Sequence, residues 1–194
     1  VEYNLDRKIV PAGAEKWDVS TDNLTYTFHL RKNAKWTNNE TVTANDYLFA
    51  WKNLAATKDA PYRSFIEIFK NGPAILDGSA EPETLGVTVK DDYTLVVELD
   101  KPVAFFLDYM AFSAFLPVNE TAYTEIGASE YGTSVNTIVT NGAFNITVFT
   151  PSAEVQFVKN PSYWNAKTVQ LDGVSLKVVT EPSTQALMFD NNEL

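Results

Sequence analysis

A strand followed by a well-marked helix constrains the fold of this chain more than any other feature. Between residues 24 and 30, Leu, Tyr, Phe and Leu occupy every second position, with Thr and His between them. Alternation with a period of two is typical of a strand that buries one face. Residues 44–57 place apolar side chains at helical spacing, and Thr43 and Asp46 have the spacing of a capping box. Both elements must therefore bury their apolar faces in a core.

The remaining elements follow from the same periodicities and from turn residues. Residues 87–99 alternate on both sides of Asp91 and Asp92, which predicts a hairpin. We expect a short buried helix at residues 103–112 and a helix with a polar face at residues 120–132. Later elements are three strands and a helix, expected at residues 141–149, 153–160 and 171–179 and from Pro182 onward.

These elements predict two regions of different organisation. The residues before about 118 indicate an α+β region. The order strand–loop–strand–helix after that position favours part of an α/β region. Because Val1 is not an initiator Met and the last helix is followed by no further element, we expect a piece of a longer protein.

Composition narrows the classes of function. With 45% hydrophobic and 21% charged residues, the chain is ordinary for a globular protein. A formal net charge of −10 disfavours a general nucleic-acid binder, whose affinity depends on clustered Lys and Arg. The absence of cysteine excludes disulfides, thiolate metal sites and cysteine nucleophiles. An aromatic content of 13% suits a packed core, but also the exposed rings of peptide and sugar binders.

No group of residues predicts catalysis. His29, the only histidine, falls on the polar face of the first strand, so we expect it to face solvent without a metal or catalytic role. The 25 carboxylates are scattered, and the 8 glycines form no phosphate-binding loop. Arg31, Lys32 and Lys35 beside Trp36 look like a small nucleic-acid patch, but the acidic balance of the chain favours a solvated loop.

Several sequence blocks, in order, resemble one known family. Residues 14–55, AEKWDVSTDNLTYTFHLRKNAKWTNNETVTANDYLFAWKNLA, resemble the segment by which family 5 extracellular solute-binding proteins are known. These are the oligopeptide-, dipeptide- and nickel-binding components of ABC importers. Later blocks agree with it: DDYTLVVELDKPVAFF, TNGAFNITVF and VKNPSYWNAKTVQLDGVSLKVV. The final helix corresponds to one that usually ends in Gly-Glu-[Ile/Leu]-Asp, with Asn192 where Gly is common. The resemblance covers nearly the whole chain.

The resemblance implies a periplasmic-binding-protein-like fold of the type II, dipeptide- and oligopeptide-binding kind. Residues 1–118 would be its small accessory domain, a mixed sheet with flanking helices. Residues 119–194 would be an incomplete part of its first α/β lobe. Most of the residues that hold the ligand in this family would then lie outside the chain.

The resemblance also implies a function. The parent protein would be the extracellular substrate-binding component of an oligopeptide importer, which captures peptides non-covalently and delivers them to a membrane permease. It would be no enzyme and need no cofactor, with a peptide ligand and ABC permease subunits as partners and no nucleic acid. We expect a monomer anchored by a lipid on the outer face of a Gram-positive cell membrane, or alternatively a periplasmic protein.

Two aromatic residues can be carried over from the family as ligand-binding candidates. Tyr62, in APYRSF, matches an aromatic that contacts the peptide in the oligopeptide-binding branch. Phe112, in YMAFSAFLPV, matches a cleft-facing ring. A core role remains the alternative for both, because buried helices and loops commonly use aromatic rings for packing. We assign the tryptophans to the structural frame: Trp17, Trp36, Trp51 and Trp164.

Two other functions remain open. The same scaffold also serves for other solutes, and a peptide pheromone, a nickel chelate, a heme or an oligosaccharide is the alternative ligand. A carboxylate-dependent hydrolase of sugars or peptides is more distant, because the sequence singles out no pair of Asp or Glu residues.

Overall fold

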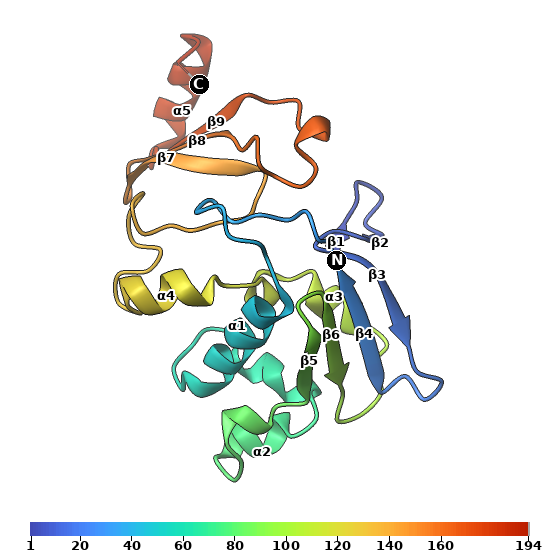
Figure 1. The fold of residues 1–194 in the computed structure, drawn as a ribbon. Coiled ribbons are helices and arrows are strands. Elements are labelled where there is room, and N and C mark those ends of the chain that lie inside the picture. Colours follow the sequence, from blue (N-terminus) through green and yellow to red (C-terminus); the bar gives the residue numbers. More distant parts are fainter. Residues whose placement is uncertain (194) are drawn as a thin grey trace.

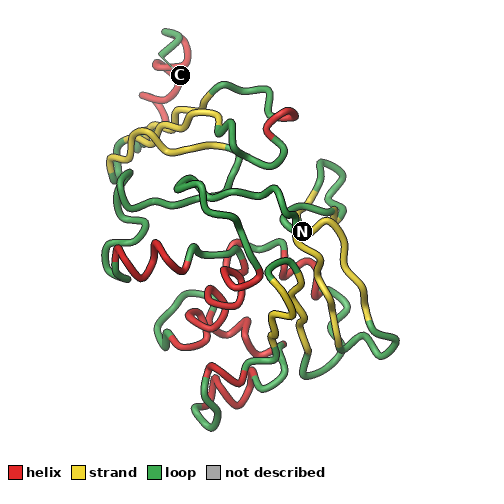
Figure 2. The backbone as a smooth tube through the Cα atoms, viewed as in Figure 1, coloured by secondary structure: helices red, strands yellow, loops and turns green. Residues whose placement is uncertain are grey.

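The computed structural model describes residues 1–193, which form two regions stacked on each other (Figure 1). We call residues 1–132 the core region and residues 140–193 the C-terminal region. The core region contains a sheet and most of the helices, and the C-terminal region contains a smaller sheet. Long loops lie between the two regions (Figure 2), and they include residues 31–43 and 133–143.

A four-stranded antiparallel sheet forms one layer of the core region. In spatial order its strands are β3 (Ala14–Val19), β4 (Thr25–Leu30), β6 (Thr94–Glu98) and β5 (Val87–Asp91). The alternation predicted for β4 is confirmed, because Tyr26, Phe28 and Leu30 are buried. The expected mixed sheet is wrong, since every pair is antiparallel: short turns reverse the chain between β3 and β4 and between β5 and β6. A small separate pair consists of β1 (Glu2–Tyr3) and β2 (Ile9–Val10).

Helices pack on this sheet and close its core. The longest is α1 (Ala44–Ala56), at the place that the sequence predicts. The shorter helices are α2 (Gly72–Asp77), α3 (Phe106–Met110), η1 (Arg63–Ile68), η2 (Pro82–Thr84) and η3 (Ser113–Phe115). Trp51 of α1 is 3% exposed and its ring lies 5.6 Å from Phe69 and 5.8 Å from Phe115. Its indole N–H donates to the Phe115 carbonyl at 3.0 Å, so the ring is both packed and hydrogen-bonded.

The start of α1 is fixed by one buried carboxylate. Asp46 Oδ2 accepts a hydrogen bond from the Thr43 backbone N–H at 2.7 Å, as the predicted capping box requires. The same oxygen accepts from the Trp36 indole N–H at 3.3 Å. Burial raises the pKa of Asp46, and its hydrogen bonds oppose that shift. Asp46 therefore joins the helix to the loop of residues 31–43.

The helix α4 (Glu120–Ile126) packs against α1. Asn119 caps it, because its Oδ1 accepts from the Ala122 N–H at 2.7 Å. The ring of Tyr123 lies edge-to-face on Phe49 of α1, with centroids 5.2 Å apart. The helix is shorter than the predicted 120–132 and ends before Gly127, whose φ is +90°. We place α4 in the core region on the basis of this packing, while the predicted domain boundary at residue 118 stays a prediction.

The C-terminal region contains a three-stranded antiparallel sheet and one helix. Its elements are β7 (Phe144–Thr150), β8 (Glu154–Lys159), η4 (Ala166–Thr168), β9 (Gly173–Lys177) and α5 (Pro182–Asp190). The strands lie in chain order, with β8 in the middle. Pro182 stands in the first turn of α5, where its missing N–H costs no hydrogen bond. The predicted strands and helix of this region are all present.

Candidate functional site

The two residues proposed as ligand contacts, Tyr62 and Phe112, touch each other. Tyr62 precedes η1 and Phe112 precedes η3, so 50 positions of sequence separate them. Their ring centroids lie 4.9 Å apart at an interplanar angle of 82°, an edge-to-face contact. Tyr62 is 52% exposed and Phe112 is half-buried. The fold thus brings both candidates to one place on the surface.

This pair begins a continuous row of aromatic rings. Phe65 lies 5.5 Å from Tyr62 and 5.6 Å from Phe112, measured between ring centroids. Tyr109 follows at 4.9 Å from Phe65, and Phe105 at 5.3 Å from Tyr109. We call these five rings the aromatic row. Its two ends, Tyr62 and Phe105, are 52% and 53% exposed, while the middle rings are half-buried.

Sequence reasoning missed three members of the aromatic row. Phe65 stands three residues after Tyr62, and Tyr109 stands four residues after Phe105 and three before Phe112. Neighbours on a helical turn have this spacing, so the signal was present in the sequence. What the sequence did not show is that η1 and α3 bring their rings together. Phe115 joins the row to the core, with its ring 6.5 Å from Phe65 and 6.4 Å from Tyr109.

The backbone of Tyr62 is in the left-handed region, with φ +63° and ψ +11°. A bulky non-glycine residue rarely adopts this conformation, and it persists only where the surroundings enforce it. The next residue supplies that enforcement. Arg63 Nε donates to the Ala55 carbonyl at 2.9 Å and Arg63 Nη2 to the Ile75 carbonyl at 3.2 Å. Arg63 thus ties the start of η1 to α1 and α2 and holds the Tyr62 ring toward solvent.

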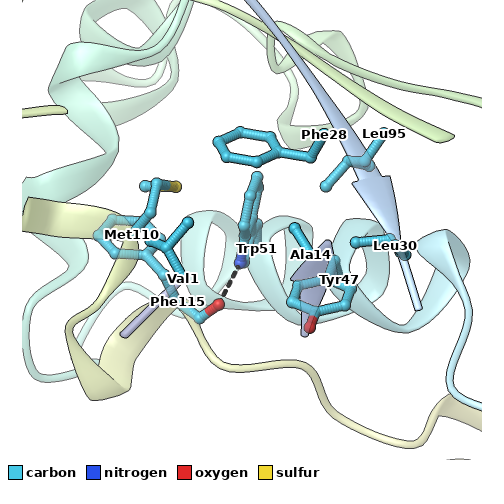
Figure 3. Close-up of a pocket in the computed structure, with 9 residues that line it drawn as sticks. All are labelled: Val1, Ala14, Phe28, Leu30, Tyr47, Trp51, Leu95, Met110 and Phe115. Atoms are coloured by element: carbon cyan, nitrogen blue, oxygen red, sulfur yellow. Dashed lines mark hydrogen bonds between the residues drawn. The ribbon is translucent and has the colours of Figure 1, made fainter. Parts of the chain in front are cut away.

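A void inside the core is too small for a peptide. Apolar side chains line it, among them Phe28, Trp51 and Met110 (Figure 3). Its volume is about 30 Å³, roughly a tenth of the smallest pockets that hold small-molecule ligands. Figure 3 also shows the Trp51 indole directed at the Phe115 carbonyl across this space. We treat the void as a packing feature of the core.

A larger cleft of about 270 Å³ lies between the two regions. Arg31 stands in its wall, with its guanidinium carbon 3.7 Å from the centroid of the Trp164 ring. The prediction that Arg31 belongs to a solvated loop is therefore wrong: its side chain is only 19% exposed and also donates to the Ala12 carbonyl. A planar guanidinium stacks readily on an indole, which explains why this cation leaves solvent. Tyr47 also lines the cleft, and burial raises the pKa of its phenol, with the charge of Asp46 adding to the shift.

Further contacts join the regions across this cleft. The Thr37 backbone N–H donates to the Thr140 carbonyl at 2.8 Å, and the Thr140 N–H donates to Thr37 Oγ1 at 3.2 Å. Trp164 packs against a small cluster that contains buried Trp36 and Val42. The predicted structural role of Trp36, Trp51 and Trp164 is confirmed by these contacts, and Trp17 packs on the main core.

His29 pairs with one carboxylate on the outer side of the sheet. Its Nε2 lies 2.7 Å from Asp18 Oδ2 of β3, with side-chain exposures of 33% and 72%. The hydrogen bond from His29 lowers the pKa of Asp18. Within residues 1–193, no cluster of His, Asp and Glu is arranged to hold a metal ion, and no helix is long and apolar enough to cross a bilayer. The exposed position expected for His29 is only partly met, because Asp18 shields one side of the ring.

The fold and sequence of this chain match known proteins along its whole length. It is 38% identical over 190 residues to the dipeptide-binding protein DppE of Bacillus subtilis, covering 97% of this chain and 35% of that protein. The structure of Listeria monocytogenes OppA bound to peptide superposes with a TM-score of 0.95 at 34% identity, covering 100% of this chain and 38% of that one. Haemophilus influenzae OppA in complex with RPPGFSPFR superposes at 0.90 with 32% identity, again over 100% and 38%.

The chain therefore spans about a third of the length of these relatives. The family described as "Bacterial extracellular solute-binding proteins, family 5 Middle" matches residues 8–194. That match agrees with the resemblance of the sequence blocks and with the superpositions over the complete chain. This chain belongs to the family 5 bacterial extracellular solute-binding proteins.

Proposed function

We propose that this chain is part of a protein that captures peptides outside the cell and delivers them to the permease of an ABC importer. The family is one of solute-binding proteins, and the relatives named above are called dipeptide- and oligopeptide-binding. The observation that carries the proposal within the chain itself is the contact between Tyr62 and Phe112. Two candidates taken from separate segments form one partly exposed aromatic surface.

The chemistry of this surface suits a non-covalent ligand. An exposed aromatic ring offers apolar area at a low cost in side-chain entropy, since few of its torsions become fixed on binding. The edge-to-face partner and the left-handed backbone hold the Tyr62 ring in place before a ligand arrives. The Tyr62 hydroxyl adds a group that both donates and accepts hydrogen bonds. Such a surface contacts a peptide side chain or its backbone without selecting one sequence strongly.

The cellular setting belongs to the proposal as well. We place the parent protein outside the cytoplasm as a monomer, held by a lipid on the outer face of a Gram-positive membrane, with the periplasm as the alternative. The relatives include proteins of both kinds of bacteria, such as DppE of Bacillus subtilis and the periplasmic OppA of Haemophilus influenzae. No catalytic activity is proposed, because the function of this family is solute binding.

The test uses a full-length chimera in which residues 1–194 replace the matching third of Bacillus subtilis DppE. Calorimetric titration with a mixed peptide pool should release or absorb heat, and Tyr62→Ala should weaken binding about tenfold or more if the ring is an anchor. Phe105→Ala is the matched control, since that ring is equally exposed at the other end of the aromatic row. It should leave the affinity within about twofold if it lies away from the ligand.

Two results would contradict this proposal. Equal losses of peptide affinity in Tyr62→Ala and Phe105→Ala would refute Tyr62 as a ligand contact, because the effect would then reflect general damage to the aromatic row. In the second result, a folded chimera gives no heat with the peptide pool but binds a nickel chelate, heme, peptide pheromone or oligosaccharide to saturation. That result would refute the general peptide ligand and identify the other solute as the ligand. The pheromone alternative is kept because the pheromone receptor PrgZ superposes with a TM-score of 0.94 at 32% identity.

A further inference from the structure

One cation joins the ends of two helices next to the aromatic row. The guanidinium of Arg63, the first residue of η1, donates to the Ala55 carbonyl of α1 and to the Ile75 carbonyl of α2. Both carbonyls lie in the last turn of their helix, where the usual N–H partner four residues further on is missing. Within the described residues of α1 and α2, neither last turn contains a basic side chain of its own. Arg63 therefore supplies, from a third segment, the positive charge that the negative ends of both helix dipoles favour.

These contacts depend on the shape of the arginine side chain. Its planar fork holds Nε and Nη2 in fixed directions, and each of them donates to a different helix. A lysine would keep the positive charge but has a single nitrogen on a flexible stem. The guanidinium is half-buried, and within residues 1–193 no carboxylate forms an ion pair with it. Backbone carbonyls at fixed places in the fold therefore hold this side chain, which makes it a rigid link.

The residue before this link is Tyr62, whose backbone is in the left-handed region at φ +63° and ψ +11°. A bulky residue leaves this region unless its surroundings hold it there. The rings of Phe65 and Phe112 contact the Tyr62 ring, so they restrain its side chain more than its backbone. The Arg63 backbone N–H donates to the Ala60 carbonyl at 3.2 Å and closes the turn around Tyr62. Because the Arg63 side chain is fixed at its far end as well, it restrains the backbone conformation of its neighbour.

We propose that Arg63 is a positioning residue for peptide binding, which holds the Tyr62 ring in its ligand-binding orientation from the ends of α1 and α2. This inference rests on the proposed function, in which Tyr62 contacts the peptide. Without both carbonyl contacts the Tyr62 backbone relaxes, and the ring occupies the binding orientation in only a fraction of the molecules. The apparent affinity falls by that fraction, because binding must first restore the orientation. Arg63 acts through Tyr62, since its own guanidinium is engaged with the two helices.

Arg63→Lys in the full-length DppE chimera tests the proposal, because it keeps the charge at the helix ends and loses the double contact. Calorimetric titration with the mixed peptide pool should show an affinity about threefold to tenfold weaker, the value of one hydrogen bond. In the Tyr62→Ala background the same substitution should change the affinity by less than about twofold, because its effect passes through the missing ring. Lys58→Ala is the matched control: it removes an exposed cation from the open groove that Arg63 also lines, and should leave the affinity unchanged.

A fluorine label on the Tyr62 ring gives a readout that needs no peptide. 3-Fluorotyrosine is placed at position 62 alone, and its fluorine resonance reports the surroundings and motion of that ring. The resonance should shift or broaden in Arg63→Lys and should stay the same in Lys58→Ala. Thermal unfolding by circular dichroism checks that each variant is folded. If Arg63→Lys does not fold, Arg63→Gln, which keeps one donor without the charge, is measured in the same way.

The outcomes distinguish positioning from general support of the fold. An unchanged fluorine resonance in the folded Arg63 variant would overturn the proposal. Equal losses of affinity with Tyr62 present and absent would overturn it too, because Arg63 would then act on the fold as a whole. A chimera that gives no heat with peptides would refute the proposed function, while the fluorine resonance would still decide whether Arg63 holds the ring.

Discussion

The core region and the C-terminal region each contain an antiparallel sheet with one apolar face, but only one of them encloses a core. In the core region Phe69, Phe106 and Phe115 are at most 1% exposed. In the C-terminal region Leu176 is 53% exposed and Phe189 is 71% exposed. The difference is that α1 and α3 lie on the first sheet, whereas α5 leaves its own apolar residues in solvent. An alternating pattern therefore predicts an apolar face, but not that the same chain contains its cover.

Trp51→Ala should have the largest effect and should be confined to the core region. The ring is packed between Phe69 and Phe115, and its removal leaves a cavity that the neighbouring side chains fill only in part. We therefore expect a loss of about 3–5 kcal/mol in the free energy of unfolding. Urea denaturation followed by circular dichroism measures it. Leu187→Ala in α5, where the side chain is 62% exposed, is the control and should change stability by less than about 0.5 kcal/mol. Similar losses for both variants would show that the two regions do not differ as described.

Arg31→Ala should weaken the contact between the core region and the C-terminal region. Stacking on Trp164 removes the guanidinium from solvent, and a cation on an indole ring is worth about 1 kcal/mol, more when both groups are desolvated. We expect faster hydrogen exchange in residues 133–143, with little change in β4 and β6. Lys32→Ala is the control, because its amine lies 5.5 Å from the Tyr93 ring within the core region. Unchanged exchange in Arg31→Ala would mean that Thr37 and Thr140 suffice to hold the regions together.

Asp46 should give the core region a distinctive dependence on pH. Its folded pKa is raised by burial above the ordinary value of 3.8, so the folded state binds the proton more tightly than the unfolded state. The contribution of this group to stability therefore declines as pH rises from 3.8 through the folded pKa, and it recovers as pH falls. Asp46→Asn should lack this component when free energies of unfolding are compared across that range. A parallel pH profile for the variant and the natural chain would refute the assignment.

The smallest effect is expected at His29. The pair with Asp18 is largely exposed, and exposed ion pairs contribute about 0–1 kcal/mol. His29→Ala should therefore change the free energy of unfolding by less than about 0.5 kcal/mol and leave peptide binding by the chimera intact. Thermal unfolding at pH 7 checks the first point and calorimetry the second. Loss of binding with an intact fold would show that His29 contributes to the ligand site.

Much of the fold follows from local patterns in the sequence. The period-2 alternation located β4, and the spacing of Thr43 and Asp46 located the start of α1, because both signals concern neighbouring residues. The hairpin of β5 and β6 was predicted from the alternation around Asp91 and Asp92, but the pairing of β4 with β6 was not, since it joins segments far apart in the chain. The buried position of Arg31 was missed for the same reason: its partner, Trp164, stands 133 positions away.

The candidate site was partly predictable in the same sense. Tyr62 and Phe112 came from resemblance to a family, and the structure adds that they touch. Their assignment as ligand contacts stays a prediction until the binding experiments are done. The other rings of the aromatic row had helical spacing but no signal that η1 and α3 would meet.

The carboxylate of Asp46 has a mechanical consequence. Asp46 lies in the first turn of α1 and accepts hydrogen bonds from Thr43 and Trp36, and the loop that carries Trp36 is hydrogen-bonded through Thr37 to Thr140. A displacement of the C-terminal region is therefore transmitted to the longest helix unless one of these short links breaks. This arrangement would make the core region and the C-terminal region move together as one rigid body.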